Sequence, residues 1–373
     1  MNRLLAYLLL FLLLATGGSP ASGQLLKVGV MLPLHDENGD GRRMVEYYRG
    51  LLMGCDSLRR TGISIGVHAW NLAENGSVSD VLKDPAAAEC DIIFGPLYTK
   101  QVKVLADFAK AHQQKLVIPF STRSTEVNSN SHVFQVYQNT ATLTEAVVSR
   151  FVERYKGCHA VIIDCNDTTS TLGVYTKALR QRMEKVRMDY NVTNLNSPAD
   201  NFAKSFVADK RNIVVLNSSR EAVLGKAFQK LNVLKGQKPE TKVELFGYAD
   251  WLSYTKNHLD NYYKYNVTIP SPYYYNAQSS ATLRFQQKYR WNFHQDMMPS
   301  VPHFALTGFD HALFFLRGLY IYGKNFTGGK GTVRYEAVQT PLEFTRLPGG
   351  GMQNHSLLLV HYRPERRVET MKY

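Results

Sequence analysis

The sequence predicts an α/β protein made of two doubly wound, Rossmann-like domains. Short apolar runs typical of β-strands alternate with longer amphipathic stretches about every 25 to 30 residues, which is the pattern of βαβ units and parallel sheets. The chain has 373 residues. A chain of this length usually forms more than one hydrophobic core, so two domains are expected. The predicted strands are Leu26–Val30, Ile63–Ala69, Asp91–Phe94, Leu116–Ile118, Ala160–Ile163, Ile213–Leu216 and Val243–Phe246.

Residues 1–23 have the layout of a secretory signal peptide. Arg3 precedes the apolar run Leu4–Leu14, and small and turn-forming residues follow as far as Gly23. This three-part pattern predicts export, with cleavage near Gly23 and Gln24. A membrane anchor is the alternative, but the run is too short to span a bilayer comfortably. We therefore expect a periplasmic or cell-envelope protein.

The composition predicts a folded, basic protein. Hydrophobic residues make up 44% of the chain and charged residues 20%, which is enough to build cores. The formal net charge is +13, to which the signal segment contributes only Arg3. Such an excess favours anionic partners such as cell-wall polymers, membrane surfaces or acidic ligands, whereas export argues against nucleic acid. Because the basic residues are spread along the chain, a solvated basic surface is the more ordinary explanation.

Four cysteines are too few for a disulfide framework in a chain of this size. Cys158 and Cys165 flank one predicted strand, which holds them about 20 Å apart, beyond bridging distance. Cys55 lies on the first predicted helix and Cys90 just before a strand, so a bridge between them stays open but has no support from spacing. We expect buried free thiols.

Each element of the predicted first domain has a local cause. Arg42–Arg60 places its apolar residues on one stripe, which suits a helix packed on a sheet. Thr99–His112 is predicted to be a helix whose first hydroxyl caps exposed amides. Pro119 ends the fourth strand, and the polar segment Ser121–Ser131 is a loop. A strand at His132–Tyr137 follows.

The predicted second domain continues the same alternation. Strands are expected at Ala160–Asp164, Val186–Tyr190 and Ile213–Leu216. Helices are expected at Leu143–Tyr155, Leu172–Lys185, Ala199–Phe206 and Glu221–Leu234, and later in the chain at Ala281–Phe293 and Phe304–Tyr322.

The chain is expected to pass between the domains three times. The first crossing is predicted near Tyr137–Thr140 and the return near Tyr248–Trp251. Extended runs at Val333–Val338 and Ser356–Tyr362 predict antiparallel strands that rejoin the second domain. The first lobe would comprise residues 24–138 and 251–330, and the second lobe residues 139–250 and 331–373.

Motifs of the common enzyme classes are absent from the sequence. No Gly-x-Ser-x-Gly elbow, His-Glu-x-x-His helix, Cys-x-x-Cys pair or phosphate-binding glycine loop occurs. We therefore expect no enzymatic activity, no cofactor and no metal. Asp36–Gly41 is similar to the start of a calcium loop, but Tyr47 stands at the twelfth position, where a bidentate glutamate is needed. We interpret the segment as a polar turn before a helix.

Tyrosines gather at Tyr262, Tyr263 and Tyr265 and again at Tyr273–Tyr275. Amphipathic rings at a domain junction can stack on a sugar or line a cleft. Aromatic packing around the hinge strands explains them equally well.

Five segments, spread over nearly all of the chain after the signal, carry a resemblance to a known family: Lys27–Leu34, Tyr48–Gly50, Asp91–Leu97, Leu116–Thr122 and Leu306–Asp310. In this order they resemble the type I periplasmic binding proteins, a group that includes leucine/isoleucine/valine-binding proteins and receptor ligand-binding regions. The resemblance implies two lobes joined by a three-segment hinge. A bacterial branch that often carries an N-terminal LysM module is more similar still. No such module fits between Gly23 and Leu26, so peptidoglycan attachment by that route is not expected.

The loops after the strands are the candidate ligand-binding residues, because ligands of open α/β sheets sit beyond the carboxyl ends of the strands. On the first lobe these residues are Leu34, His35, Trp70, Asn71, Tyr98, Thr99, Ser121, Thr122 and Arg123. On the second lobe they are Asn166, Leu172, Asn217, Ser218, Tyr248 and Asp250.

The resemblance also implies roles for some of these residues. In amino-acid-binding relatives, loops matching Tyr98–Thr99 and Ser121–Thr122 hold the ligand carboxylate, and an acidic residue near Asp250 holds its ammonium group. Leu172 and Asn217–Ser218 stand where such relatives usually present aromatic contacts, which argues against a simple amino-acid ligand. Arg123 suits an anion, although an exposed loop arginine is as often only solvated.

We therefore expect an exported solute-binding protein that closes by hinge bending on a small polar ligand, either anionic or similar to an amino acid or peptide. The expected partners are this ligand and either an ABC-transporter permease, for amino-acid transport, or a cell-wall component, for envelope sensing. The alternative is a non-catalytic interaction protein, such as a cell-wall synthesis regulator, that kept the fold without the pocket.

Overall fold

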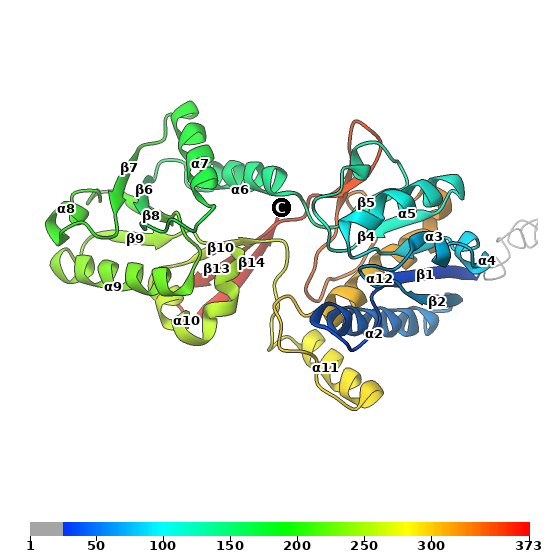
Figure 1. Ribbon diagram of the computed structural model, residues 1–373. Helices are drawn as coiled ribbons and strands as arrows, with labels where there is room; N and C mark the ends of the chain where they lie inside the picture. Colours follow the sequence, from blue (N-terminus) through cyan, green and yellow to red (C-terminus); the bar gives the residue numbers. More distant parts are fainter. Residues whose placement is uncertain (1–24) are drawn as a thin grey trace, which may run out of the picture.

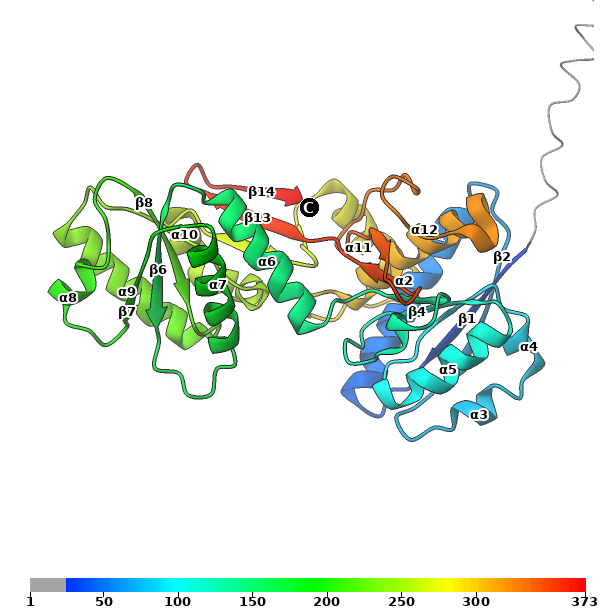
Figure 2. The same ribbon diagram turned by 90° about the horizontal axis from the view of Figure 1, so that it is seen from above.

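The computed structural model describes residues 25–373, so the expected signal peptide lies outside the described residues. Two lobes lie side by side and are joined by extended segments in the middle of the molecule (Figure 1). Each lobe contains a largely parallel sheet with helices on both faces (Figure 2). The predicted fold class, two doubly wound α/β lobes, is confirmed.

The first lobe is built on a seven-stranded sheet. Its strands are β1 (Leu26–Leu32), β2 (Ile65–Asn71), β3 (Ile92–Phe94), β4 (Lys115–Ile118), β5 (Val133–Gln135), β11 (Phe344–Arg346) and β12 (Met352–Asn354). Their order is β11-β12-β5-β4-β3-β1-β2, and every pair is parallel except β11 with β12 at the edge. The central strands are short runs of apolar residues. Helices cover both faces of the sheet and exclude water, so side chains on both faces of these strands are apolar.

The helices of the first lobe are α2 (Gly39–Arg59), α3 (Val78–Val81), α4 (Pro85–Ala88), α5 (Thr99–Ala111), α11 (Ser280–Phe293) and α12 (Phe304–Tyr322), with short turns η1 (Glu126–Asn128) and η3 (Gly323–Asn325). Helices α2 and α12 share one core with the sheet, and α5 shares the core on the other face. Glycines allow α2 and α12 to pack closely: a Cβ built on Gly50 would lie 1.8 Å from the carbonyl oxygen of Ala305.

The second lobe is built on the four-stranded parallel sheet β7-β6-β8-β9. These strands are β6 (His159–Asp164), β7 (Tyr190–Asn194), β8 (Arg211–Leu216) and β9 (Lys242–Leu245). Its helices are α6 (Thr140–Arg154), α7 (Gly173–Lys185), α8 (Ala199–Ala203), α9 (Glu221–Gln237) and α10 (Thr255–Lys264), with the turn η2 (Ala249–Tyr254). Helices α6 and α7 pack on one face of the sheet, and α8, α9 and α10 pack on the other.

A three-stranded antiparallel sheet completes the second lobe. It consists of β10 (Thr268–Ser271), β13 (Leu358–Arg363) and β14 (Arg367–Lys372), with β13 in the middle. A single bridge between Phe246 and Thr268 continues the parallel sheet into it. Side chains of β13 enter both cores of the lobe.

Three segments of chain pass between the lobes. The first lies between Gln135 and Thr140, where crossing was expected. The second lies between Ser271 and Ser280, and the third lies between Asn354 and Leu358.

The two later lobe boundaries differ from those predicted. Residues 251–271 belong to the second lobe, because β10 pairs with β13 and the apolar side chains of Val267 and Ile269 enter that lobe's core. Residues 331–354 belong to the first lobe, because β12 pairs with β5. Strands β11 and β12 have three residues each, too few for an alternating pattern to reveal them.

Two strand predictions are also wrong. The segment Val186–Tyr190 is mostly the turn that ends α7, because Arg187 adopts a left-handed φ of 55°, and the strand β7 starts only at Tyr190. Val333–Val338 contains no strand; its end is held by Asp310, whose carboxylate accepts the backbone N–H of Val338.

The cysteine prediction is confirmed. All four thiols are buried and free, including Cys55 and Cys90.

Candidate functional site

The loops after β3 and β4 bring hydroxyl groups together at one edge of the first lobe. Thr99 is the first residue of α5, and its Oγ1 lies 2.8 Å from Oγ of Ser121, which follows β4. Ser121 is buried, Thr122 is half-buried and Arg123 is exposed. The hydroxyl pair therefore lies at the N-terminus of a helix, where the first N–H groups and the helix dipole favour an anion.

Tyr98 and Asn71 are hydrogen-bonded within the first lobe. The Tyr98 hydroxyl donates to Oδ2 of Asp40 at 3.2 Å. Burial, and after it the charge of Asp40, raises the pKa of Tyr98 to about 12, so this phenol stays a donor. Oδ1 of Asn71 accepts the backbone N–H of Leu34 at 2.8 Å. These contacts fix the loops after β1, β2 and β3 relative to one another.

His35 lies against the start of α2. Its Nδ1 is enclosed and has no hydrogen-bond partner among residues 25–373. A Cβ on Gly41 would lie 2.3 Å from the carbonyl oxygen of His35, so only glycine fits there. Asn38 caps α2 by accepting the N–H of Gly41, which makes the segment the polar turn that was expected. Within the described chain no group of His, Cys, Asp and Glu side chains is arranged to hold a metal ion.

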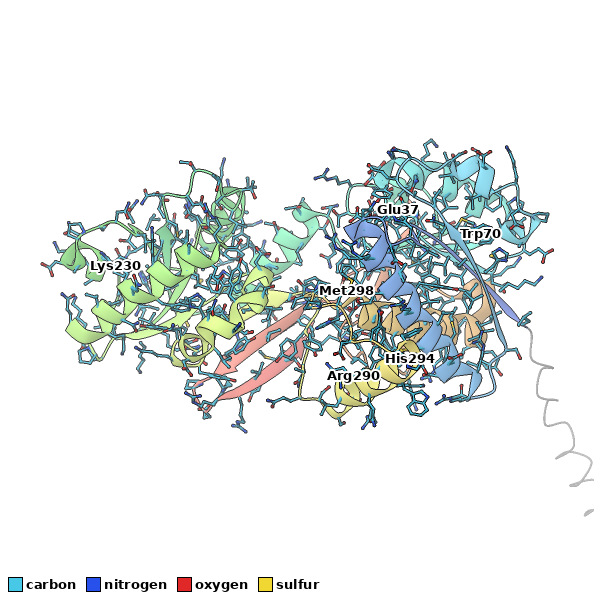
Figure 3. All side chains as sticks on the ribbon, turned by 60° about the horizontal axis from the view of Figure 1, so that its bottom comes forward. Glu37, Trp70, Lys230, Arg290, His294 and Met298 are labelled. Atoms are coloured by element: carbon cyan, nitrogen blue, oxygen red, sulfur yellow. The ribbon has the colours of Figure 1, made fainter. Side chains whose placement is uncertain are left out.

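Trp70 lies apart from these residues. Its indole stacks on His68, with ring centroids 4.1 Å apart, and Nε1 donates to Oδ2 of Asp84 at 3.0 Å. Figure 3 shows Trp70 on the part of the first lobe away from the second lobe. The side chain packs toward α4, so the structure does not bring it to the edge where Thr99 and Ser121 meet.

The strand ends of the second lobe form a network of amides and carboxylates. Asn217 links two of them: its Oδ1 accepts the backbone N–H of Cys165 at 2.8 Å and its Nδ2 donates to Oδ1 of Asp164 at 3.0 Å. Asn166 adopts a left-handed φ of 54° and exchanges two side-chain hydrogen bonds with Asn194. These polar groups are largely satisfied by one another.

Asp167 belongs to this network, although the sequence analysis did not select it. The buried hydroxyl of Ser218 donates to its Oδ2 at 2.7 Å, and Nη1 of Arg220 lies 3.3 Å from its Oδ1. The Ser218 hydrogen bond, followed by that of Thr169, lowers the pKa of Asp167 to about 2. The carboxylate is therefore ionised and already paired. Its position after β6 was the signal that could have identified it.

Leu172, Tyr248 and Asp250 occupy different environments. Leu172 precedes α7 and packs on the core beneath it. The Tyr248 hydroxyl donates to the carbonyl of Leu216, and its ring packs edge-on against Tyr175. Both the hydroxyl and the ring are therefore used in contacts within the second lobe. Asp250 is exposed and has no ion pair within residues 25–373, which leaves its carboxylate accessible.

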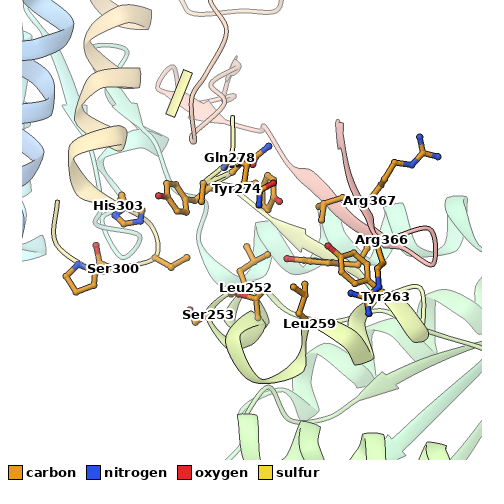
Figure 4. Close-up of a pocket in the computed structure, with 18 residues that line it drawn as sticks. Leu252, Ser253, Leu259, Tyr263, Tyr274, Gln278, Ser300, His303, Arg366 and Arg367 are labelled. Carbon is orange, nitrogen blue, oxygen red and sulfur yellow. Dashed lines mark hydrogen bonds between the residues drawn. The ribbon is translucent and has the colours of Figure 1, made fainter. Parts of the chain in front are cut away.

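A hollow of about 840 Å³ lies between the lobes beside the second crossing (Figure 4). We call it the hinge hollow; it is lined by residues of 252–263 and 362–368 from the second lobe, 274–278 from the crossing and 299–303 from the first lobe. None of the candidate strand-end residues lines it. The tyrosine clusters were the sequence signal for it: Tyr263, Tyr274 and Tyr275 face it, whereas Tyr262 and Tyr265 are core residues.

Comparison with known proteins yields structural similarity only. No family model matches the chain, and no curated protein matches it either. A putative branched-chain amino acid ABC transporter protein from Rhodospirillum rubrum is 13% identical, with a TM-score of 0.63 over 93% of this chain and 100% of that one. Two further structures each have a TM-score of 0.55 and 13% identity over 93% of this chain. One is a branched-chain amino acid ABC transporter periplasmic ligand-binding protein from Burkholderia xenovorans, of which 94% is covered. The other is an ABC-type branched-chain amino acid transporter from Rhodopseudomonas palustris, of which 95% is covered.

The chain has the type I periplasmic binding protein fold. The resemblance drawn from the five sequence segments is thus confirmed at the level of the fold. Among residues 25–373, no helix has the length and apolar character needed to cross a membrane.

Proposed function

We propose that this protein is a periplasmic solute-binding protein whose two lobes close on a small polar solute with a carboxylate group. The observation that carries the proposal is the Thr99–Ser121 hydroxyl pair at the N-terminus of α5. Hydroxyl and backbone N–H donors at a helix N-terminus form a site for a carboxylate, and Arg123, which follows in the same loop, adds a positive charge.

The second lobe would supply the opposing contacts. Asp250 offers a free carboxylate to an ammonium or hydroxyl group of the solute, whereas the amides of Asn166 and Asn217 at neighbouring strand ends would have to exchange an internal hydrogen bond for one to the solute. The three short crossings support closure by hinge bending, with the solute contacting both lobes and shifting the balance toward the closed state. Neither a cofactor nor catalysis is required.

The comparisons support the same class of function. The three structures described above are named as branched-chain amino acid transporter proteins. By analogy, the partners of this chain would be its solute and a membrane permease or a cell-wall component.

One observation favours the alternative, a non-catalytic cell-envelope interaction protein. The strand-end groups of the second lobe are largely paired with each other, as Asp167 is with Ser218 and Asn217 with Asp164. Polar groups of the second lobe that are already hydrogen-bonded to one another form fewer hydrogen bonds to a solute.

Thermal-shift measurements against amino acids, short peptides, sugars and wall fragments separate the two functions. A solute that binds only the folded protein raises its melting temperature as its concentration rises. We expect a carboxylate-containing solute to do so, and Ser121→Ala and Arg123→Ala to weaken its effect. The matched control is Ser149→Ala on α6, which should behave as the parent protein. If no compound in the panel stabilises the protein, the interaction function is the better explanation.

A further inference from the structure

The hinge hollow presents aromatic ring surface from both sides. Tyr263 and Tyr362 belong to the second lobe and have ring centroids 5.9 Å apart. Tyr275 comes from the crossing, and its ring lies 4.2 Å from that of His303 in the first lobe. Tyr263, Tyr274 and Tyr275 are only half-buried, so part of each ring stays open to a ligand. Amphipathic rings of this kind pack against flat ligands that also carry polar groups.

The charge of the hinge hollow is positive. Arg366 and Arg367, where β14 begins, line it, and no carboxylate does. Arg366 is partly neutralised, because its Nη2 lies 2.9 Å from Oδ1 of Asp260. Arg367 contributes only its stem, because its guanidinium points away from the tyrosine rings on the other face of β14 (Figure 4). The guanidinium of Arg366 lies over the Tyr263 ring, 5.8 Å from its centroid, and its pair with Asp260 is solvent-exposed, so an anionic group of a ligand can replace Asp260 there.

Hydrogen-bonding groups in the hollow require a ligand with both donors and acceptors. Nδ1 of His303 lies 3.0 Å from the carbonyl oxygen of Met298, so Nδ1 carries the proton. Burial lowers the pKa of His303, which leaves Nε2 as an unprotonated acceptor. The Tyr275 hydroxyl accepts from Nε2 of Gln286 at 2.7 Å and keeps its own proton to donate. A plain hydrocarbon acid would leave these groups unpaired.

We propose that the hinge hollow is a second binding site, separate from the strand ends, that takes an acidic sugar of the hexuronate type. The ring C–H faces of the sugar would pack on the tyrosines, its carboxylate would pair with Arg366, and its hydroxyls would meet His303 and Tyr275. A volume of about 840 Å³ lies within the usual range of small-molecule sites, about 300 to 1,000 Å³. The inference stands on the hollow alone and does not depend on the function proposed for the strand ends.

Saturation-transfer NMR and calorimetry with digalacturonate test the proposal, with neutral galactobiose as the matched ligand. We expect digalacturonate to bind and galactobiose to bind at least about tenfold more weakly, because only the acid pairs with a guanidinium. Arg366→Ala and Tyr274→Leu should each weaken binding by a similar factor. Arg180→Ala, which removes an exposed arginine of α7 outside the hollow that has no ion pair among residues 25–373, is the matched control. Circular dichroism and melting temperatures establish that each variant is folded.

The variants also distinguish this site from the strand ends. Digalacturonate binding that survives Arg123→Ala and Thr122→Ala but is lost in Arg366→Ala supports the hinge hollow. Three results would overturn it: no saturation transfer at millimolar digalacturonate, equal binding of galactobiose, or loss of binding in Arg123→Ala while Arg366→Ala binds normally. Tyr274→Phe keeps the ring and should retain most of the affinity, so it guards against a loss caused by misfolding.

Discussion

The carboxylate of Asp310 on α12 accepts the backbone N–H of Gln339 at 2.8 Å, and it also accepts those of Val338 and Thr340. The carbonyl oxygen of Gln339 in turn accepts the N–H of Tyr274 in the second crossing. One buried side chain therefore ties a loop of the first lobe and a hinge segment to the same helix.

Replacing Asp310 should destabilise the protein strongly. Asp310→Ala leaves three N–H groups, two of them buried, without their acceptor, so we expect a loss of about 3 kcal/mol or more in the free energy of unfolding, measured by urea denaturation. Asp107→Ala, which removes an exposed carboxylate paired with Lys103 on α5, should change stability by less than about 0.5 kcal/mol. Similar losses in the two variants would contradict this role of Asp310.

Glu46 predicts a pH dependence of stability. Its Oε2 accepts the N–H of Met298 at 2.7 Å, and burial raises its pKa from 4.5 to about 7. An acid with a higher pKa in the folded state holds its proton more tightly there, so its contribution to stability is greatest below about pH 4.5 and is lost as the pH rises to 7.

Glu46→Gln should therefore flatten part of this pH profile. We expect the difference in unfolding free energy between pH 5 and pH 8 to shrink by on the order of 2 kcal/mol relative to the parent protein. Burial likewise raises the pKa of Asp310 to about 7, so some decline remains in the variant. A profile that is unchanged by the substitution would show that Glu46 does not titrate in this range.

Two glycine-to-alanine substitutions should have opposite effects on stability. One glycine lies in the contact between α2 and α12, and the other lies on α9 in open space. Gly50→Ala places a methyl group 1.8 Å from the Ala305 carbonyl oxygen, which should separate the helices and cost about 1 to 3 kcal/mol. Gly236→Ala on α9 meets no atom within 4 Å and should stabilise the protein by about 0.4 to 1 kcal/mol. Melting temperatures of both variants, one lowered and one raised, provide the test.

The buried thiols should react slowly in the native protein. Burial raises the pKa of Cys55 and Cys90 to about 12 and that of Cys165 to about 11, so thiolate is scarce at neutral pH. We expect iodoacetamide to label the native chain far more slowly than the urea-unfolded chain, and mass spectrometry to count four free thiols after unfolding. Fewer than four would reveal a disulfide.

The strand and helix periodicity predicted most of the fold because it depends on local sequence. Long elements such as the helix at Arg42–Arg60 and the strand at Ala160–Asp164 appear close to their predicted limits. The tail was misassigned because membership of β12 in the first sheet depends on pairing with β5, more than 200 residues away, as in the register of Met352 with Phe134. Periodicity reports the conformation of a segment and not its partner.

The candidate site was predicted less completely for the same reason. Counting from strand ends selected Thr99 and Ser121, which the structure brings to 2.8 Å. It also selected Trp70, whose position in β2 turns the ring toward Asp84 instead. Asp167 was not predicted as a site residue because its pairing with the buried hydroxyl of Ser218, 51 positions later in the chain, depends on the fold and not on the local sequence.

The placement of β12 and β13 has a consequence for how the protein is made. The first lobe needs β12 inside its sheet, and the second lobe needs β13 and β14, which are the last two strands of the chain. During synthesis, both lobes would remain incomplete until almost the last residue has left the ribosome. Neither lobe can therefore fold fully as a unit while the last strands of the chain are still being made.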